Sequence, residues 1–272
     1  MGTAFLNGIS IGYDDEGSGE PLVLVHGHPF DRTLWRPQVE RFRATHRVIA
    51  PDLRGYGETT VVPGKTLLET YARDLESLLD HLGVGEFVLG GLSMGGQIVM
   101  ECYRLFPERI RGVILADTFA KAETGAGKRQ RNEVADSLLR DGMDKYSEQF
   151  LPQMMAPANI ARLPDVAAHV LDMMRTTSAE GAAAALRGRA ERRDYVGLLS
   201  RVSVPTLVIV GSEDGFTPVS DAEFMHARLP HSALVVIDGA GHLPNLERET
   251  EFGEALAAFL ESDLSVSART ER

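Results

Sequence analysis

Residues 86–96 read EFVLGGLSMGG, and this segment decides the fold. It joins a short apolar run to a glycine-rich turn, and helical periodicity follows as far as residue 106. A Gly-x-Ser-x-Gly motif between a strand and a helix bends the chain sharply and holds the serine hydroxyl at the carboxyl end of the sheet. The motif in residues 91–95 therefore predicts that Ser93 is a nucleophile.

Apolar runs and helical stretches alternate on both sides of this segment. The runs are nearly continuous in Val, Ile and Leu, which is typical of parallel strands that helices cover on both faces. We predict an α/β fold with a mostly parallel central sheet and helices on both faces, and an antiparallel edge strand over residues 5–13. The predicted buried strands are residues 21–27, 47–52, 86–91, 111–117, 206–212 and 233–238, and the predicted helices are residues 65–82, 96–106, 220–229 and 249–260.

The alternation stops after Asp117. Residues 118–200 contain helical patterns broken by Gly and Pro but no strand-like run. We predict an α/β core of residues 1–117 and 201–272, interrupted after the predicted strand of residues 111–117 by a helical cap of residues 118–200, called the cap segment below. The cap segment carries a net charge of +1 and the rest of the chain −12.

The cap segment contains two sets of residues that bear on substrate binding. Its five methionines are predicted to pack in the core, because apolar residues at helical spacing usually do. Four of its arginines could meet a substrate carboxylate, although exposure to solvent is the expected role of each. The methionines are Met143, Met154, Met155, Met173 and Met174, and the arginines are Arg129, Arg131, Arg187 and Arg189.

A serine nucleophile needs a base, and the base needs an orienting carboxylate. His242 lies in GAGHLPNLE, in a loop after the last predicted strand, where it can approach Ser93 across the sheet edge. Asp214 follows the preceding predicted strand, and the chain order Ser, Asp, His is the one expected for this architecture. The alternatives for the acid are Glu213, which precedes Asp214, and Asp117, which ends an earlier predicted strand.

Acyl transfer also needs donors for the developing oxyanion. The N–H of Met94 lies just after the nucleophile at a helix start, and the N–H of His28 lies in the loop after the first parallel strand. A metal site on His26 and His28 is not expected, because no carboxylate or cysteine cluster accompanies them. No cofactor is expected either, since the chain contains neither G-x-G-x-x-G nor G-x-x-x-x-G-K-[ST].

Composition excludes several classes of protein. The net charge of −11 over 272 residues disfavours nucleic-acid binding, and the single Cys102 precludes an intrachain disulfide. No apolar run approaches the roughly 20 residues of a membrane helix. We therefore expect a soluble, cytoplasmic protein whose partner is a small molecule rather than a membrane or nucleic acid, and a homo-oligomer is compatible with the sequence.

The segments LVHGHP, PDLRGYGET, GGLSMGG, GSEDGFTP and GAGHLPNLE resemble the α/β-hydrolase superfamily from about Pro21 to Leu260. The chain is similar to small capped bacterial esterases and lactonases, especially the 3-oxoadipate enol-lactonase-like and pimeloyl-ester carboxylesterase-like branches. The resemblance implies the same triad and the same oxyanion amides. Serine at position 93 argues against dehalogenases and epoxide hydrolases, which carry aspartate there. The imidazole of His28 departs from the residues usual at its position.

The expected function is a cofactor-independent serine hydrolase that cleaves a small carboxylic ester or lactone through an acyl-enzyme on Ser93. Three alternatives stay open. With the same triad, the protein could act as a perhydrolase, also called a cofactor-free haloperoxidase, or as a C–C bond hydrolase. It could also be a ligand receptor that retains the triad.

Overall fold

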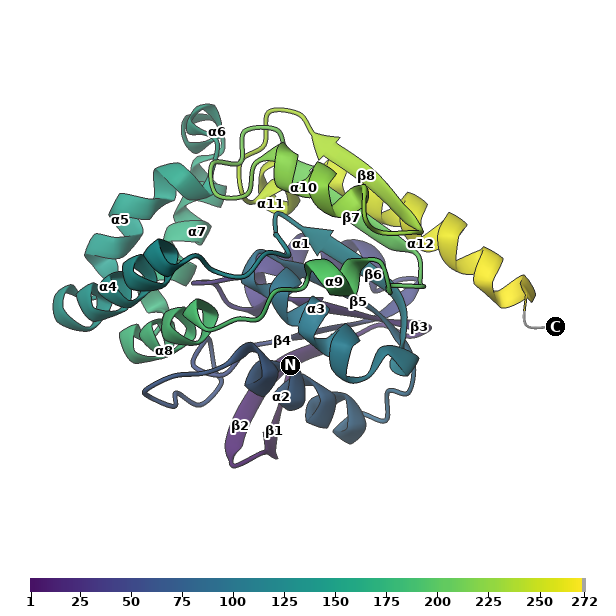
Figure 1. Ribbon diagram of the computed structural model, residues 1–272, viewed down its shortest axis with the longest axis horizontal. Coiled ribbons are helices and arrows are strands. Elements are labelled where there is room, and N and C mark those ends of the chain that lie inside the picture. Colours follow the sequence, from purple (N-terminus) through teal and green to yellow (C-terminus); the bar gives the residue numbers. More distant parts are fainter. Residues whose placement is uncertain (271–272) are drawn as a thin grey trace.

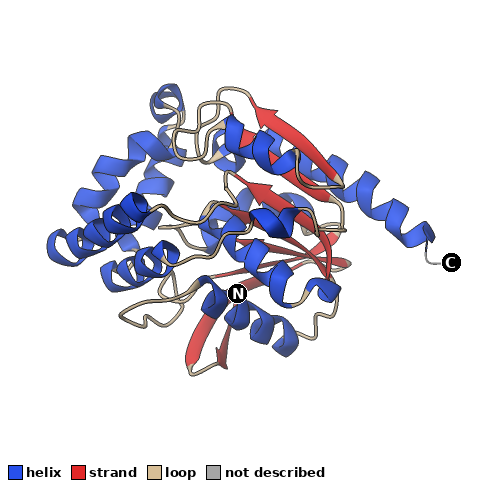
Figure 2. Ribbon diagram, viewed as in Figure 1, coloured by secondary structure: helices blue, strands red, loops and turns tan. Residues whose placement is uncertain are grey.

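A computed structural model describes the backbone of residues 1–270 and the side chains of residues 1–261. It has one eight-stranded sheet in the spatial order β1-β2-β4-β3-β5-β6-β7-β8. The six neighbouring strands from β4 to β8 in this order are all parallel to one another. Figure 2 shows the strands running through the middle of the molecule between layers of helices. This is a mostly parallel α/β sheet with helices on both faces, as predicted. The strands are β1 (Gly2–Leu6), β2 (Ile9–Glu16), β3 (Glu20–Val25), β4 (His46–Pro51), β5 (Phe87–Leu92), β6 (Ile110–Ala116), β7 (Thr206–Gly211) and β8 (Ser232–Ile237).

Residues 5–13 lie at an antiparallel edge of the sheet, as predicted, but the prediction was wrong in detail at both edges. The expected single strand over residues 5–13 is a hairpin of β1 and β2, because Asn7 and Gly8 both take positive φ and turn the chain between the strands. Strand β8 is not fully buried, although its sequence is as apolar as that of a central strand. It pairs only with β7 and leaves Val236 43% exposed.

Helices cover both faces of the sheet and bury two large apolar clusters. One cluster gathers side chains of α1 and α12, and the other gathers side chains of α2, α3 and α10. Outside the cap segment, the helices are η1 (Arg32–Trp35), α1 (Arg36–Phe42), α2 (Leu68–His81), α3 (Met94–Leu105), η2 (Pro107–Arg109), α10 (Val219–His226), α11 (Pro244–Glu247) and α12 (Glu249–Thr270). No helix in the described part of the chain is both long and apolar enough to cross a membrane.

Six helices lie between β6 and β7, and Figure 1 shows most of them stacked at one end of the sheet. Helix α4 packs on α8, and α5 packs on α7. All five cap methionines are buried in the cluster that also holds α1 and α12, as the packing interpretation predicts. The six helices are α4 (Gly125–Asp141), α5 (Met143–Met154), α6 (Pro157–Arg162), α7 (Pro164–Thr176), α8 (Ala179–Ala190) and α9 (Val196–Leu199).

The cap segment is tied to the loops at the carboxyl edge of the sheet. The main-chain N–H of Thr66 donates to the carbonyl of Ala184 in α8 at 3.0 Å, and the N–H of His242 donates to the carbonyl of Met154 at 3.1 Å. Gly55 and Gly181 touch so closely that a Cβ on Gly55 would lie 2.8 Å from the Cα of Gly181. These contacts hold the cap segment in place over that edge.

Candidate active site

Ser93 lies at the turn between β5 and α3 with φ 57° and ψ −114°, a strained conformation for a residue with a side chain. Three hydrogen bonds hold it there. Its N–H donates to the carbonyl of Ala116 at 2.9 Å, and its carbonyl accepts from Gln97 N–H at 3.2 Å and from Thr118 Oγ1 at 2.7 Å. The turn therefore fixes the direction in which the hydroxyl leaves the sheet.

The two glycines of the motif lie so close to neighbouring backbone that no side chain would fit at either position. A Cβ on Gly91 would lie 2.8 Å from the nitrogen of Gly96, and a Cβ on Gly95 would lie 2.8 Å from the carbonyl oxygen of His26. The motif predicts this feature, because the turn works only where the backbone of α3 can approach β3 and β5 directly.

His242 and Asp214 form a buried pair. The His242 Nδ1 lies 2.7 Å from Asp214 Oδ2, and both side chains are almost fully buried. The other carboxylate oxygen accepts the main-chain N–H groups of Phe216 and Thr217 at 2.8 and 3.1 Å, and the Thr217 hydroxyl also donates to Asp214. Burial alone would raise the pKa of Asp214, but His242 and Thr217 outweigh it and hold that pKa below its usual value.

Among the described residues, neither alternative acid forms a hydrogen bond with His242, whose Nδ1 pairs with Asp214. Glu213 is exposed. Asp117 is buried after β6 with φ 43°; its Oδ1 accepts the N–H of Gly211 at 2.9 Å, and its Oδ2 has no hydrogen-bond partner among the described residues. Burial and the nearby charge of Asp214 raise the pKa of Asp117 well above its usual range, so its carboxyl group is poorly suited to stabilise an imidazolium.

Asp117, Asp214 and His242 are also the one group of three in the described residues whose side chains could converge on a metal ion. The hydrogen bond between His242 and Asp214 accounts for their closeness without an ion. Each nitrogen of His26 and His28 also has a partner. His26 pairs with the carbonyl of Gly27 and the N–H of Leu53, and His28 pairs with the hydroxyls of Tyr56 at 2.7 Å and Tyr146 at 3.4 Å.

Two main-chain amides next to Ser93 are free. In the described part of the chain, neither the His28 N–H nor the Met94 N–H donates a hydrogen bond. Met94 is the first residue of α3, where an N–H has no partner within the helix and favours negative charge. Burial lowers the pKa of His28 well below its usual value, and Arg189 and Arg131 lower it further, so its imidazole is neutral.

A cavity of about 240 Å³ opens between the sheet edge and the cap segment. Its core side is formed by His28, Ser93, Phe216, Thr217 and His242, so three of the five predicted site residues face it, and Asp214 adjoins it through His242. Aromatic rings form one wall. Tyr146 stacks on Phe150 at 4.3 Å between centroids, and Phe150 stacks on Phe216 at 6.4 Å.

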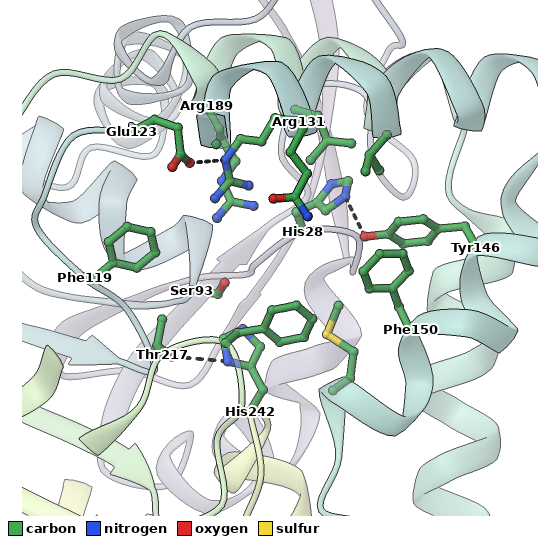
Figure 3. Close-up of a pocket in the computed structure, with 16 residues that line it drawn as sticks. His28, Ser93, Phe119, Glu123, Arg131, Tyr146, Phe150, Arg189, Thr217 and His242 are labelled. Atoms are coloured by element: carbon green, nitrogen blue, oxygen red, sulfur yellow. Dashed lines mark hydrogen bonds and ion pairs between the residues drawn. The ribbon is translucent and has the colours of Figure 1, made fainter. Parts of the chain in front are cut away.

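Charged side chains from the cap segment line another part of the cavity, as Figure 3 shows. Arg131 comes from α4, Arg189 from α8, and Glu123 from the loop before α4. The expectation that each cap arginine is solvated is wrong for Arg189, which is only 6% exposed. Of the other two candidates, Arg129 is exposed and Arg187 pairs with Asp136. The sequence pattern carried no signal for the aromatic wall or for Thr217.

Comparisons with known proteins agree with this architecture. The alpha/beta hydrolase fold family matches residues 20–249. The 3-oxoadipate enol-lactonase 2 of Acinetobacter baylyi is 29% identical over 255 residues, which are 93% of this chain and 93% of that relative. A thermophilic esterase from Thermogutta terrifontis, solved with malate bound, is 40% identical with a TM-score of 0.91 over 93% of each chain. The enol-lactonase from Burkholderia xenovorans is 26% identical with a TM-score of 0.89, over 95% of this chain and 99% of that one. Since the family match spans most of its length, this chain belongs to the α/β-hydrolase family.

Proposed function

We propose that the protein is a serine hydrolase that cleaves a small carboxylic ester or lactone through an acyl-enzyme on Ser93. The observation that carries the proposal is the buried pair of His242 and Asp214 beside a cavity that Ser93 also lines. The esterase and enol-lactonase relatives support the choice of reaction.

In the first half of the reaction, the Ser93 hydroxyl attacks the substrate carbonyl carbon. The Nε2 atom of His242 takes the hydroxyl proton, and the Asp214 carboxylate stabilises the imidazolium that forms. The carbonyl oxygen gains negative charge, which the free amides of His28 and Met94 stabilise by donating hydrogen bonds. The imidazolium then protonates the leaving oxygen, and the carbon–oxygen bond breaks.

In the second half, water replaces the alcohol. His242 takes a proton from the water, whose oxygen attacks the acyl carbon. The bond between the carbon and Ser93 Oγ then breaks, the imidazolium returns the proton to Oγ, and the acid is released. In a lactone the alcohol and the acid belong to one molecule, so the product is a single hydroxy or keto acid.

The cap segment is proposed to select the substrate. At about 240 Å³ the cavity lies below the roughly 300–1,000 Å³ that is usual for ligand pockets, which favours a small acyl group or ring. The wall of Tyr146, Phe150 and Phe216 continues to the imidazole of His242, whose centroid is 5.2 Å from that of Phe216. An apolar acyl chain would lie along this wall with its carbonyl carbon toward Ser93.

The test compares Ser93→Ala with the wild type on p-nitrophenyl acetate, and Ser18→Ala, at an exposed serine, is the matched control. We expect kcat to fall by about 10⁶-fold in Ser93→Ala only. A fluorophosphonate probe should label the wild type and Ser18→Ala once per chain, as measured by intact mass, and should leave Ser93→Ala unlabelled. Turnover that survives in Ser93→Ala would reject the mechanism, and labelling without turnover on a broad ester panel would favour the receptor alternative.

A further inference from the structure

Arg189 is a buried positive charge without a negative partner. Its side chain lines the cavity and is only 6% exposed, and it forms no ion pair within the described residues. Its Nε donates to Gln97 Oε1 at 3.2 Å, while its two terminal nitrogens make no hydrogen bond to any described residue. A buried charge is costly unless it is paired, so this guanidinium lacks the anion that would normally accompany it.

The neighbouring arginines differ from Arg189 in this respect. Arg192 donates to Glu123 and to the main-chain oxygens of Lys121 and Arg189. Arg131 also pairs with Glu123. One carboxylate therefore serves two guanidinium groups, and these arginines lower the pKa of Glu123 to about 2 against the opposing effect of its burial. Arg189 is left uncompensated.

The local field at Arg189 is positive. Burial lowers its pKa well below the usual value, and Arg131 and Arg192 lower it further. An arginine nevertheless stays protonated in proteins. An anion that enters the cavity would relieve both the lost solvation and the repulsion between these groups.

The position of Arg189 is fixed relative to the nucleophile. Gln97 lies one helical turn after Ser93 in α3, and its side chain holds the guanidinium by the Nε bond. Helix α8 itself is tied to the core through the bond between Thr66 and Ala184. Figure 3 shows Arg189 and Arg131 side by side on one side of the cavity and Tyr146 and Phe150 on another.

We propose that Arg189, with Arg131 beside it, forms a carboxylate-binding subsite in the cap segment, so that the substrate is an ester or lactone with a carboxylate away from the reacting carbonyl. This inference rests on the proposed function. A planar guanidinium presents donors in the geometry that a carboxylate accepts, often through two parallel bonds. One carboxylate on the substrate would neutralise the unpaired guanidinium of Arg189, and a half-ester or an acidic lactone carries one such carboxylate.

The kinetic test uses p-nitrophenyl half-esters of succinate, glutarate and adipate. Each is compared with a neutral ester in which an isopropyl group replaces the terminal carboxylate, so chain length and shape are matched. The readout is the ratio of kcat/KM for the anionic ester to kcat/KM for its neutral partner, after subtraction of the rate without enzyme. Wild-type protein should favour the anionic ester at one or more chain lengths, and Arg189→Met should lower that ratio by about 10- to 100-fold.

Two further variants control this measurement. Arg187 lies on the same helix as Arg189, but its guanidinium pairs with Asp136 and does not line the cavity. The ratio of kcat/KM values for Arg187→Met should therefore match that of the wild type. Arg189→Lys keeps the charge but loses the planar fork, so its ratio should lie between those of the wild type and Arg189→Met. If Arg189→Met does not fold, the lysine variant still tests the proposal.

A binding measurement separates this inference from the proposed function. In Ser93→Ala, which cannot form an acyl-enzyme, calorimetry should detect binding of the glutarate half-ester, and the double variant with Arg189→Met should lose it. Binding without turnover in the wild type would reject the hydrolase and keep the subsite. Turnover of both ester series with equal ratios in the wild type and Arg189→Met would overturn the subsite and keep the hydrolase.

Discussion

Replacement of Asp214 by asparagine tests the proposed triad most directly. The side-chain carbonyl oxygen of the introduced asparagine can still accept from the N–H groups of Phe216 and Thr217, which now bond Asp214 Oδ1 at 2.8 and 3.1 Å. The amide nitrogen would then stand where Oδ2 lies 2.7 Å from His242 Nδ1. An amide donates there instead of accepting, so the imidazole proton moves to Nε2 and the ring can no longer take a proton from Ser93.

The expected loss follows from this tautomer. A triad that keeps its geometry but carries the wrong tautomer loses about 10⁴ in kcat, which corresponds to about 5.5 kcal/mol of transition-state stabilisation. The assay is steady-state hydrolysis of p-nitrophenyl acetate, with active sites counted by fluorophosphonate labelling. A thermal melt of each variant checks that the fold survives.

Asp117→Asn and Glu213→Gln are the matched controls, because they neutralise the two alternative acids and leave the hydrogen bond between His242 and Asp214 in place. Each should retain kcat within about tenfold of the wild type, since neither carboxylate bonds the imidazole. The assignment of Asp214 is refuted if Asp214→Asn stays within tenfold of the wild type. It is also refuted if Asp117→Asn falls as far as Asp214→Asn.

Three smaller predictions concern stability and binding. Burial and Asp214 raise the pKa of Asp117 in the folded protein above its value in the unfolded chain. The contribution of Asp117 to the free energy of unfolding is therefore greatest below about pH 4 and decreases as the pH rises. Asp117→Asn should therefore be more stable than the wild type to urea at pH 7.5, and this gain in stability should vanish near pH 4. An equal gain at pH 7.5 and pH 4 would contradict the raised pKa of Asp117. Gly95→Ala should destabilise the protein by about 1–3 kcal/mol in urea unfolding, because its Cβ would press on the carbonyl of His26, and a neutral effect would count against the close packing. Phe150→Ala should lower kcat/KM about tenfold for a hexanoyl ester and less for acetate, since the ring stacks between Tyr146 and Phe216; equal losses would reject the aromatic wall as the acyl site.

The sequence predicts the parallel part of the sheet well because burial on both faces selects continuous Val, Ile and Leu. It fails at β8, where an equally apolar run forms an edge strand, since periodicity reports side-chain pattern and not the number of neighbouring strands. It also misses the turn at Asn7 and Gly8, because the alternation of β1 continues into β2 almost without interruption.

The sequence likewise predicts one part of the candidate site, the proposed triad, and misses the other part, the residues of the cap segment. Ser93, His242 and Asp214 follow strands at the edge where parallel strands end, so motif and chain order are enough to bring them together. The residues of the cap segment do not follow such a rule. Tyr146 and Phe150 reach the cavity only because α5 packs over it, and helix packing across an insertion depends on contacts that a single sequence does not encode in its local pattern.

Arg189 shows what this limit means for function. In the sequence it is one of several cap arginines, and an arginine is usually exposed. Its environment arises from three separate segments, because α8 carries it, Gln97 of α3 holds its Nε, and Glu123 is already occupied by Arg131 and Arg192. A buried charge without a counter-ion carries a desolvation cost that no partner offsets, so Arg189→Met should melt at the same temperature as the wild type or higher. A melting temperature that falls by several degrees would assign Arg189 to the stability of the cap segment, whereas an unchanged or higher one, together with a lost preference for anionic esters, would assign it to the substrate.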